Sequence, residues 1–80
     1  MIPDVRGKTE IIGDIIRHTL ESLIITHIMH KANLCYGQLK RYLPYCIESG
    51  LVEISGEGYR ATDKGRQYLS YYDALKELTA

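Results

Sequence analysis

The fold of this chain is decided by residues 26–60, whose sequence is THIMHKANLCYGQLKRYLPYCIESGLVEISGEGYR. This stretch begins with the apolar spacing of a short helix, passes through a tight turn at residues 31–34, and enters a longer amphipathic helix. Two short segments with strand character follow, on either side of a glycine-containing turn at residues 55–58. This order predicts a helix-turn-helix with a hairpin behind it, which presents its second helix to the major groove of DNA.

The distribution of charge agrees with a DNA-facing surface in this stretch. No Asp or Glu occurs between Ser22 and Ile47, whereas Lys31, Lys40 and Arg41 all lie there. The net charge of the chain is zero, which counts against a general polyanion binder. Phosphate contact depends on local charge, however, so the acid-free window makes double-stranded DNA the predicted partner.

Length and composition indicate one small globular domain, since 45% of the 80 residues are hydrophobic. Cys35 and Cys46 would lie roughly 16 Å apart on one helix, which is too far for a disulfide. Two free thiols favour a reducing compartment. The sequence shows no signal peptide and no apolar run as long as a membrane span. The expected location is therefore cytoplasmic and nucleoid-associated.

Periodicity outlines the rest of the fold. We expect a loosely ordered lead over residues 1–7, a winged-helix domain over residues 8–62 and a C-terminal helix over residues 63–80. In chain order, the expected elements are helices over residues 8 to about 23, 27–32 and about 36–49, strands over residues 51–54 and 59–61, and a helix over residues 63 to about 79. The predicted fold class is mainly α with a small β-hairpin: a three-helix core, a two-stranded wing and a long C-terminal helix.

Single residues indicate where helices begin, turn, end or cross one another. Gly13 weakens the first helix and suggests that another helix crosses it closely. Thr26 is a plausible N-cap for the second helix, and Asn33 tolerates the left-handed backbone of a tight turn. Leu34 can fill the space between the second and third helices, and Gly50 ends the third helix.

The third helix has an apolar side and a basic side, which is what a recognition helix requires. Gln38, Lys40 and Arg41 are expected to face the groove, where Arg binds guanine and Gln binds adenine. The whole set expected to contact DNA is Thr26, Lys31, Tyr36, Gln38, Lys40, Arg41 and Arg60. The alternative is an ordinary solvated helix face.

The C-terminal helix carries more apolar surface than docking onto one small domain needs. Its stripe consists of Tyr68, Tyr71, Tyr72, Leu75 and Leu78. Two copies packed through this stripe would form a symmetric homodimer. The alternative is that the whole stripe folds back onto Ile11, Ile15 and Ile16 of the first helix.

Motifs for catalysis or ligand binding do not stand out. His27 and His30 are three residues apart, but no second pair of ligands at metal-binding spacing accompanies them. The sequence shows no nucleophile–base pairing and no glycine-rich phosphate loop. We expect a protein that is not an enzyme and has no cofactor, no metal, no membrane partner and no evident small-molecule ligand.

With these elements in place, the chain resembles the archaeal winged helix-turn-helix domains classed as transcriptional-regulator-like. The similarity covers nearly the whole chain and is carried by residues 28–34 (IMHKANL), Leu39, Tyr42, Leu43, residues 50–52 (GLV) and residues 59–65 (YRATDKG). The resemblance implies binding of double-stranded DNA as a small transcriptional regulator. It also implies a homodimer, because several members dimerise through a C-terminal helix.

Two residues depart from the pattern of that family. Pro44 lies inside the third helix, where typical members carry a polar residue, and it predicts a kink or early fraying. Cys35 replaces the usual Ser or Thr before this helix, and a thiol is a weaker cap.

Two other functions fit the same fold. A winged helix can serve as a protein–protein adaptor without DNA affinity, a use that suits zero net charge, Pro44 and Glu57. It can also coat DNA without choosing a sequence, as a chromatin-like protein does, although neutral charge counts against that. Salt dependence separates the adaptor from the DNA binders, and competition between duplexes separates the regulator from the coating protein.

Overall fold

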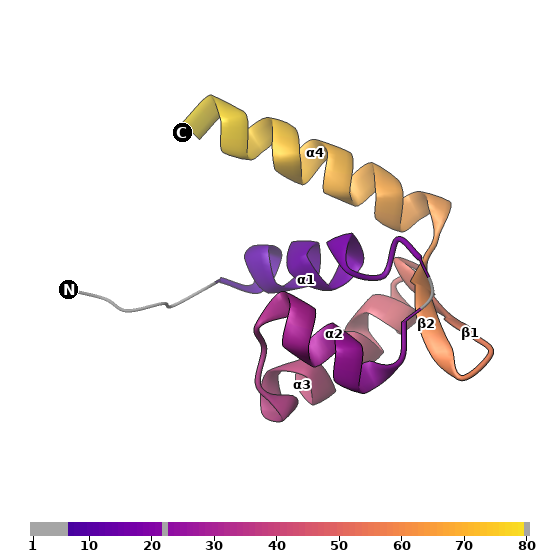
Figure 1. Cartoon of the computed structure of the whole chain (residues 1–80). Coiled ribbons are helices and arrows are strands. Elements are labelled where there is room, and N and C mark those ends of the chain that lie inside the picture. The colour runs from indigo at the N-terminus through magenta and orange to yellow at the C-terminus, as the bar shows by residue number, and fades with distance from the viewer. Residues whose placement is uncertain (1–6, 22, 80) are drawn as a thin grey trace.

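Four helices and a two-stranded antiparallel sheet make up the part of the chain that the computed structural model describes, residues 7–21 and 23–79 (Figure 1). In chain order these are α1 (Lys8–Arg17), α2 (Ile25–Ala32), α3 (Tyr36–Glu48), β1 (Val52–Ser55), β2 (Gly58–Ala61) and α4 (Asp63–Thr79). The hairpin projects at one side of the helices, and α4 runs over α1 (Figure 1). The predicted fold class is confirmed.

The core lies where α1, α2 and α3 meet, and the hairpin and α4 close it. Fully buried side chains come from α1, α2 and α3: Ile15, Ile16, Ile28, Leu39 and Cys46. Burial also raises the pKa of the Cys46 thiol to about 11, so this cysteine packs as an apolar residue. None of the helices within the described ranges is long and apolar enough to cross a membrane.

The first helix is shorter than its apolar spacing predicts. It ends at Arg17, whereas the sequence predicts a helix that continues to about Leu23. The hydroxyl of Thr19, which is fully buried, donates hydrogen bonds to the carbonyls of Ile15 and Ile16 at 2.8 and 3.1 Å. These bonds satisfy carbonyls that a continuing helix would have bonded along its own backbone.

The chain after α1 then runs along the outer edge of the hairpin instead of forming helix. Leu23 and Tyr59 exchange two backbone hydrogen bonds, with N–O distances of 3.0 and 2.8 Å. The backbone N–H of Ala61 also donates to the carbonyl of Thr19, at 2.6 Å. The prediction of helix to Leu23 is therefore wrong, because pairing with a distant strand takes over backbone groups that the local pattern assigned to a helix.

The hairpin has a two-residue turn and matches the predicted wing. β1 is shifted by one residue from its predicted range, and β2 begins one residue earlier than predicted. Val52 pairs with Ala61 and Ser55 pairs with Gly58, which leaves only Gly56 and Glu57 in the turn. Gly56 has a φ of +61°, as the first position of a type II′ hairpin turn requires.

Several hydrogen bonds hold the start of the C-terminal helix against the rest of the domain. Thr62 caps it by accepting a hydrogen bond from the backbone N–H of Gly65 at 3.0 Å, and its own N–H donates to the Leu51 carbonyl at 3.0 Å. Lys64 donates to the carbonyl of Ser49 at 2.7 Å. The two bonds of Thr62 fix the direction in which α4 leaves the hairpin.

Gly13 is the point at which α4 crosses α1, as its position in the sequence predicted. A Cβ atom at Gly13 would lie 2.8 Å from the ring of Tyr72, so any other residue would force this ring to move. Tyr72 is 6% exposed and belongs to the core of the domain. The Tyr68 hydroxyl donates to the Thr9 carbonyl at 3.2 Å, and Arg17 forms an ion pair with Asp73.

His18 follows α1 and makes stability sensitive to pH. Burial lowers the pKa of His18 below its ordinary value; Asp14 opposes this, while Arg17 and Lys31 act with it. The unfolded chain therefore binds the proton more readily than the folded one. The stability that comes from keeping His18 neutral in the folded state is complete above the unfolded pKa of about 6.5. It is lost as the pH falls through the folded pKa.

We expect His18→Gln to weaken the loss of stability between about pH 7.5 and 5.5. The measurement is urea denaturation of the wild type and the variant at both pH values. A wild type that loses no more stability than the variant would contradict the effect of burial on His18.

Candidate nucleic-acid interface

The turn between α2 and α3 holds the two helices at a fixed angle. Asn33 adopts the left-handed conformation, with φ 55° and ψ 48°, as predicted. The next residue, Leu34, donates its backbone N–H to the Met29 carbonyl at 3.0 Å, and its side chain is buried in the core. The predicted role of Leu34 as a plug between the helices is confirmed.

The start of α2 differs from its prediction. The helix begins at Ile25 with Ile24 at the cap position, and no side chain caps it. Thr26 therefore lies inside the first turn instead of capping it, with an exposed side chain. A hydroxyl at this place is free to meet a phosphate beside the helix N-terminus.

Cys35 caps α3 through a reciprocal pair of hydrogen bonds with Gln38. The Cys35 sulfur accepts from the Gln38 backbone N–H at 3.4 Å, and the Gln38 side-chain oxygen accepts from the Cys35 N–H at 3.1 Å. The departure from Ser or Thr thus leaves a complete capping box in place. Gln38 has a second consequence: a bidentate bond to adenine needs the same side-chain oxygen that closes this box.

Pro44 does not end α3. The helix continues through it to Glu48, with Ser49 as its C-cap, so the predicted early fraying is wrong. Pro44 lies on the exposed side of the helix, where its ring takes part in the surface. The exposed residues of α3 are Tyr36, Gly37, Lys40, Arg41, Pro44, Tyr45 and Glu48.

The two basic residues of α3 lie on different flanks of this exposed surface. The Lys40 ammonium is 5.9 Å from the centroid of the Tyr36 ring, on the flank next to the hairpin. The Arg41 guanidinium is 5.8 Å from the Tyr42 ring centroid and borders the flank next to α1. Tyr45 is covered in part by the Lys8 ammonium, 4.2 Å from its ring centroid.

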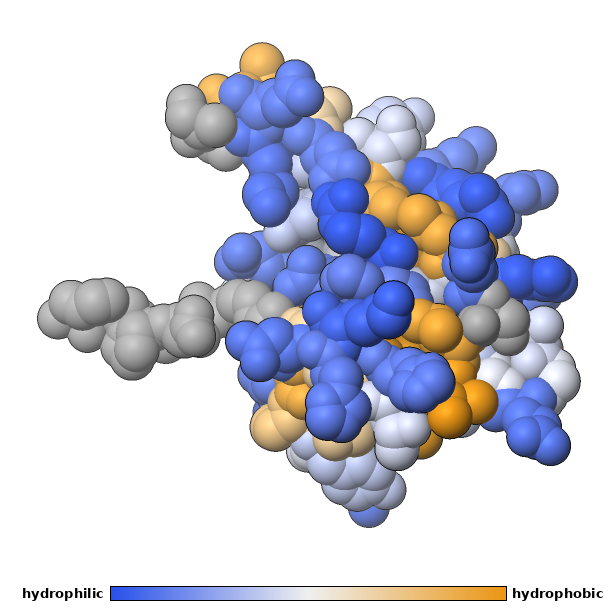
Figure 2. Space-filling model, in the orientation of Figure 1, coloured by the Kyte–Doolittle hydropathy of each residue, from blue (hydrophilic) through white to orange (hydrophobic). Residues whose placement is uncertain are grey.

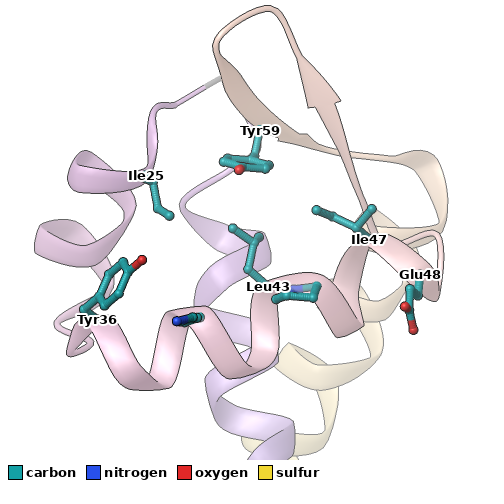
Figure 3. Close-up of a pocket in the computed structure, with 8 residues that line it drawn as sticks. Ile25, Tyr36, Leu43, Ile47, Glu48 and Tyr59 are labelled. Atoms are coloured by element: carbon teal, nitrogen blue, oxygen red, sulfur yellow. The ribbon is translucent and has the colours of Figure 1, made fainter.

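An open hollow of about 340 Å³ lies between α3, the start of α2 and the hairpin (Figure 3). We call it the apolar hollow, because the uncharged side chains that line it are Ile25, Tyr36, Leu43, Pro44, Ile47 and Tyr59. Ile25, Tyr36 and Tyr59 point toward one another across its opening (Figure 3). Its charged neighbours are Lys40 and, at the end of α3, Glu48.

The other predicted contacts lie away from the apolar hollow. Lys31 lies beside the chain that follows α1, next to Arg17 and His18. Arg60 is on the opposite face of the hairpin from its neighbour Tyr59 and pairs with Glu53 at 3.2 Å. The structure thus brings Tyr36 and Lys40 together and leaves Arg60 and Lys31 at separate edges of the molecule.

Sequence reasoning missed the contribution of Ile25, Pro44, Ile47 and Tyr59 to this surface. Pro44 and Ile47 share a flank of α3 with Tyr36 at helical spacing, which a search for apolar residues beside the basic ones would have found. Ile25 and Tyr59 join them only through folding, so no local pattern points to them.

The apolar stripe of α4 divides between the core and the surface. Leu69 and Tyr72 are buried against the domain, and Tyr68 is partly buried. Tyr71, Leu75 and Leu78 are 76%, 54% and 83% exposed. In Figure 2, hydrophobic atoms emerge at the C-terminal end of α4, beyond a largely hydrophilic surface. The alternative that the whole stripe folds back is therefore wrong for Tyr71, Leu75 and Leu78, and the homodimer stays a prediction.

No group of three or more His, Cys, Asp or Glu side chains that could hold a metal ion occurs among residues 7–21 and 23–79.

Comparisons with known proteins agree on the fold. A protein-family model described as winged helix-turn-helix matches residues 5–80. Among solved structures, the chain is similar to the crystal structure of Sso10a-2, which is described as a DNA-binding protein from Sulfolobus solfataricus. The TM-score is 0.81 and the sequence identity 23%, over 92% of this chain and 82% of that chain. A search of curated proteins gave no match.

Proposed function

The chain belongs to the winged helix-turn-helix family, and from this premise we propose that it binds double-stranded DNA with the exposed side of α3 in the major groove. The observation that carries the proposal is the exposed surface of α3, which has Lys40 and Arg41 on its two flanks and no acidic residue before Glu48. The likeness to a DNA-binding protein of the same fold supports it.

The proposal assigns different tasks to the polar side chains. Lys40 and Arg41 reach phosphates or base edges, and Thr26 at the exposed start of α2 contacts the backbone. Lys31 and Arg60 contact phosphates only at the edges of the interface, and Arg60 first has to leave Glu53. Gln38 holds the start of the helix in this scheme, because its oxygen closes the capping box.

The proposed DNA-binding unit consists of two copies of the chain. Tyr71, Leu75 and Leu78 follow one another at the spacing of a helix–helix seam and are exposed in the monomer. Packing of two such helices gives a symmetric homodimer whose recognition helices face successive major grooves, roughly 34 Å apart. We place this dimer in the cytoplasm at the nucleoid, as a small transcriptional regulator.

The test of DNA binding is a titration of random fluorescent duplexes at about 50 and 200 mM salt, followed by anisotropy. We expect affinity to fall steeply with salt, because each phosphate contact releases counterions. Lys40→Gln should weaken binding and reduce the slope of log affinity against log salt concentration by about one. Lys64→Gln is the matched control, since Lys64 donates to Ser49 beside α4 and should leave affinity unchanged.

The outcome at low salt decides between the proposed function and its rival. Absence of binding at about 50 mM salt would overturn the proposal and favour the protein–protein adaptor. Equal effects of Lys40→Gln and Lys64→Gln would leave DNA binding standing and remove α3 from the interface.

A further inference from the structure

The flank of α3 beside the hairpin offers few hydrogen-bond donors for base edges. Gln38 uses its oxygen in the capping box, and Arg41 lies on the other flank. Lys40 is the one basic side chain of α3 that borders the apolar hollow. Most of the surface that α3 and the hairpin present together is therefore hydrocarbon and aromatic ring.

One chemical group in the major groove of DNA matches such a surface. Thymine carries a 5-methyl group there, and apolar side chains recognise it by contact instead of by hydrogen bonds. Adenine, guanine and cytosine present nitrogen and oxygen atoms, which lose hydration against hydrocarbon without gaining a partner.

We propose that the apolar hollow receives thymine methyl groups and gives the protein a preference for duplexes with thymine in the contacted positions. This inference rests on the proposed binding of α3 in the major groove. Tyr36 and Pro44, which are both exposed, provide the outer contact surface from α3, and Ile25 and Tyr59 line the hollow from α2 and the hairpin.

The surroundings of the hollow favour DNA over an apolar ligand or a peptide as its occupant. The exposed surface of α3, proposed to enter the groove, runs directly into the hollow. Lys40 stands beside it with a positive charge for a neighbouring phosphate, and the stretch from Leu23 to Ile47 contains no acid. Glu48, at the C-terminal end of α3, limits the contact on that side.

The experiment compares one A·T-rich duplex with the same duplex in which deoxyuridine replaces every thymidine. Uracil pairs as thymine does and lacks only the methyl group, so the ratio of the two affinities isolates it. We expect a loss of about fourfold for each methyl group buried, the factor that corresponds to about 0.8 kcal/mol per methylene-sized group.

Two variants attribute this ratio to the hollow. Tyr36→Ser removes an exposed apolar wall and should bring the thymine-to-uracil ratio close to one. Tyr45→Ser is the control: it changes a tyrosine of comparable exposure on the same helix, outside the hollow, and should keep the ratio. Both variants are measured on the same two duplexes, so any effect of the methyl groups on the shape of the duplex is common to them.

Each result has one meaning. Equal affinity of the wild type for both duplexes would overturn the inference and leave the proposed function intact. A thymine preference that survives Tyr36→Ser would also overturn it, by moving the contact elsewhere. Failure to bind either duplex at about 50 mM salt would overturn the proposed function itself.

Discussion

Replacing Gly65 with alanine is expected to lower the free energy of unfolding by about 3 kcal/mol, although alanine is the better helix former. A Cβ atom at Gly65 would lie 2.1 Å from the carbonyl oxygen of Leu51 and 3.1 Å from its carbonyl carbon. That carbonyl already accepts the N–H of Thr62 at 3.0 Å, so it is held between the hairpin and α4. Relief of the clash requires α4 to move away from the domain.

Gly37→Ala is the matched control in another helix. Its Cβ atom would meet only the Cys35 sulfur, at 3.9 Å, so the variant should be as stable as the wild type or gain up to about 1 kcal/mol. Urea denaturation at one fixed protein concentration, followed by circular dichroism, measures both variants. If Gly65→Ala unfolds at the same urea concentration as the wild type, α4 does not start against Leu51.

Charged substitutions on the exposed stripe of α4 are expected to give a folded monomer that binds DNA roughly 100-fold more weakly. The double variant Tyr71→Glu, Leu75→Glu places two carboxylates in the proposed dimer seam. Both side chains are largely exposed in the monomer, so its core remains intact. Two linked copies gain affinity from binding together, and the monomer loses that gain.

Light scattering after gel filtration gives the mass, and anisotropy gives the affinity. The double variant Ser70→Glu, Ala74→Glu adds the same charge at the same spacing on exposed positions of α4 and should remain a dimer. Unchanged mass and affinity in the Tyr71, Leu75 variant would place the interface elsewhere or show that the protein acts as a monomer.

Local signals were sufficient for the turn, the wing and the last two helices. Asn33, Gly50 and Thr62 mark ends and starts of helices through their own backbone or side-chain chemistry, and each is found at the place it predicted. The extent of α1 was not predictable in this way. Leu20 and Leu23 keep helical spacing, but the segment bonds to β2, which is far away in the sequence.

The candidate site shows the same limit. Lys40 and Arg41 were recognised from charge, whereas the flank on which each lies depends on the position of α1 and the hairpin. Tyr71 and Tyr72 are adjacent in sequence, yet one is exposed and the other is buried because α1 lies under only one of them. The hydrogen bond between Gln38 and Cys35, which uses the side-chain oxygen that adenine would need, was not predicted from the sequence.

The backbone bridge between Leu23 and Tyr59 also affects the tendency of the protein to aggregate at high concentration. A strand with an unpaired edge is a template for sheets that grow between molecules. Here β2 has β1 on one side and the chain after α1 on the other, so intermolecular pairing at the hairpin is confined to the four residues of β1. That edge is short and carries the charge of Glu53. At high protein concentration, the hairpin is therefore a poor starting point for aggregation through sheets that grow between molecules.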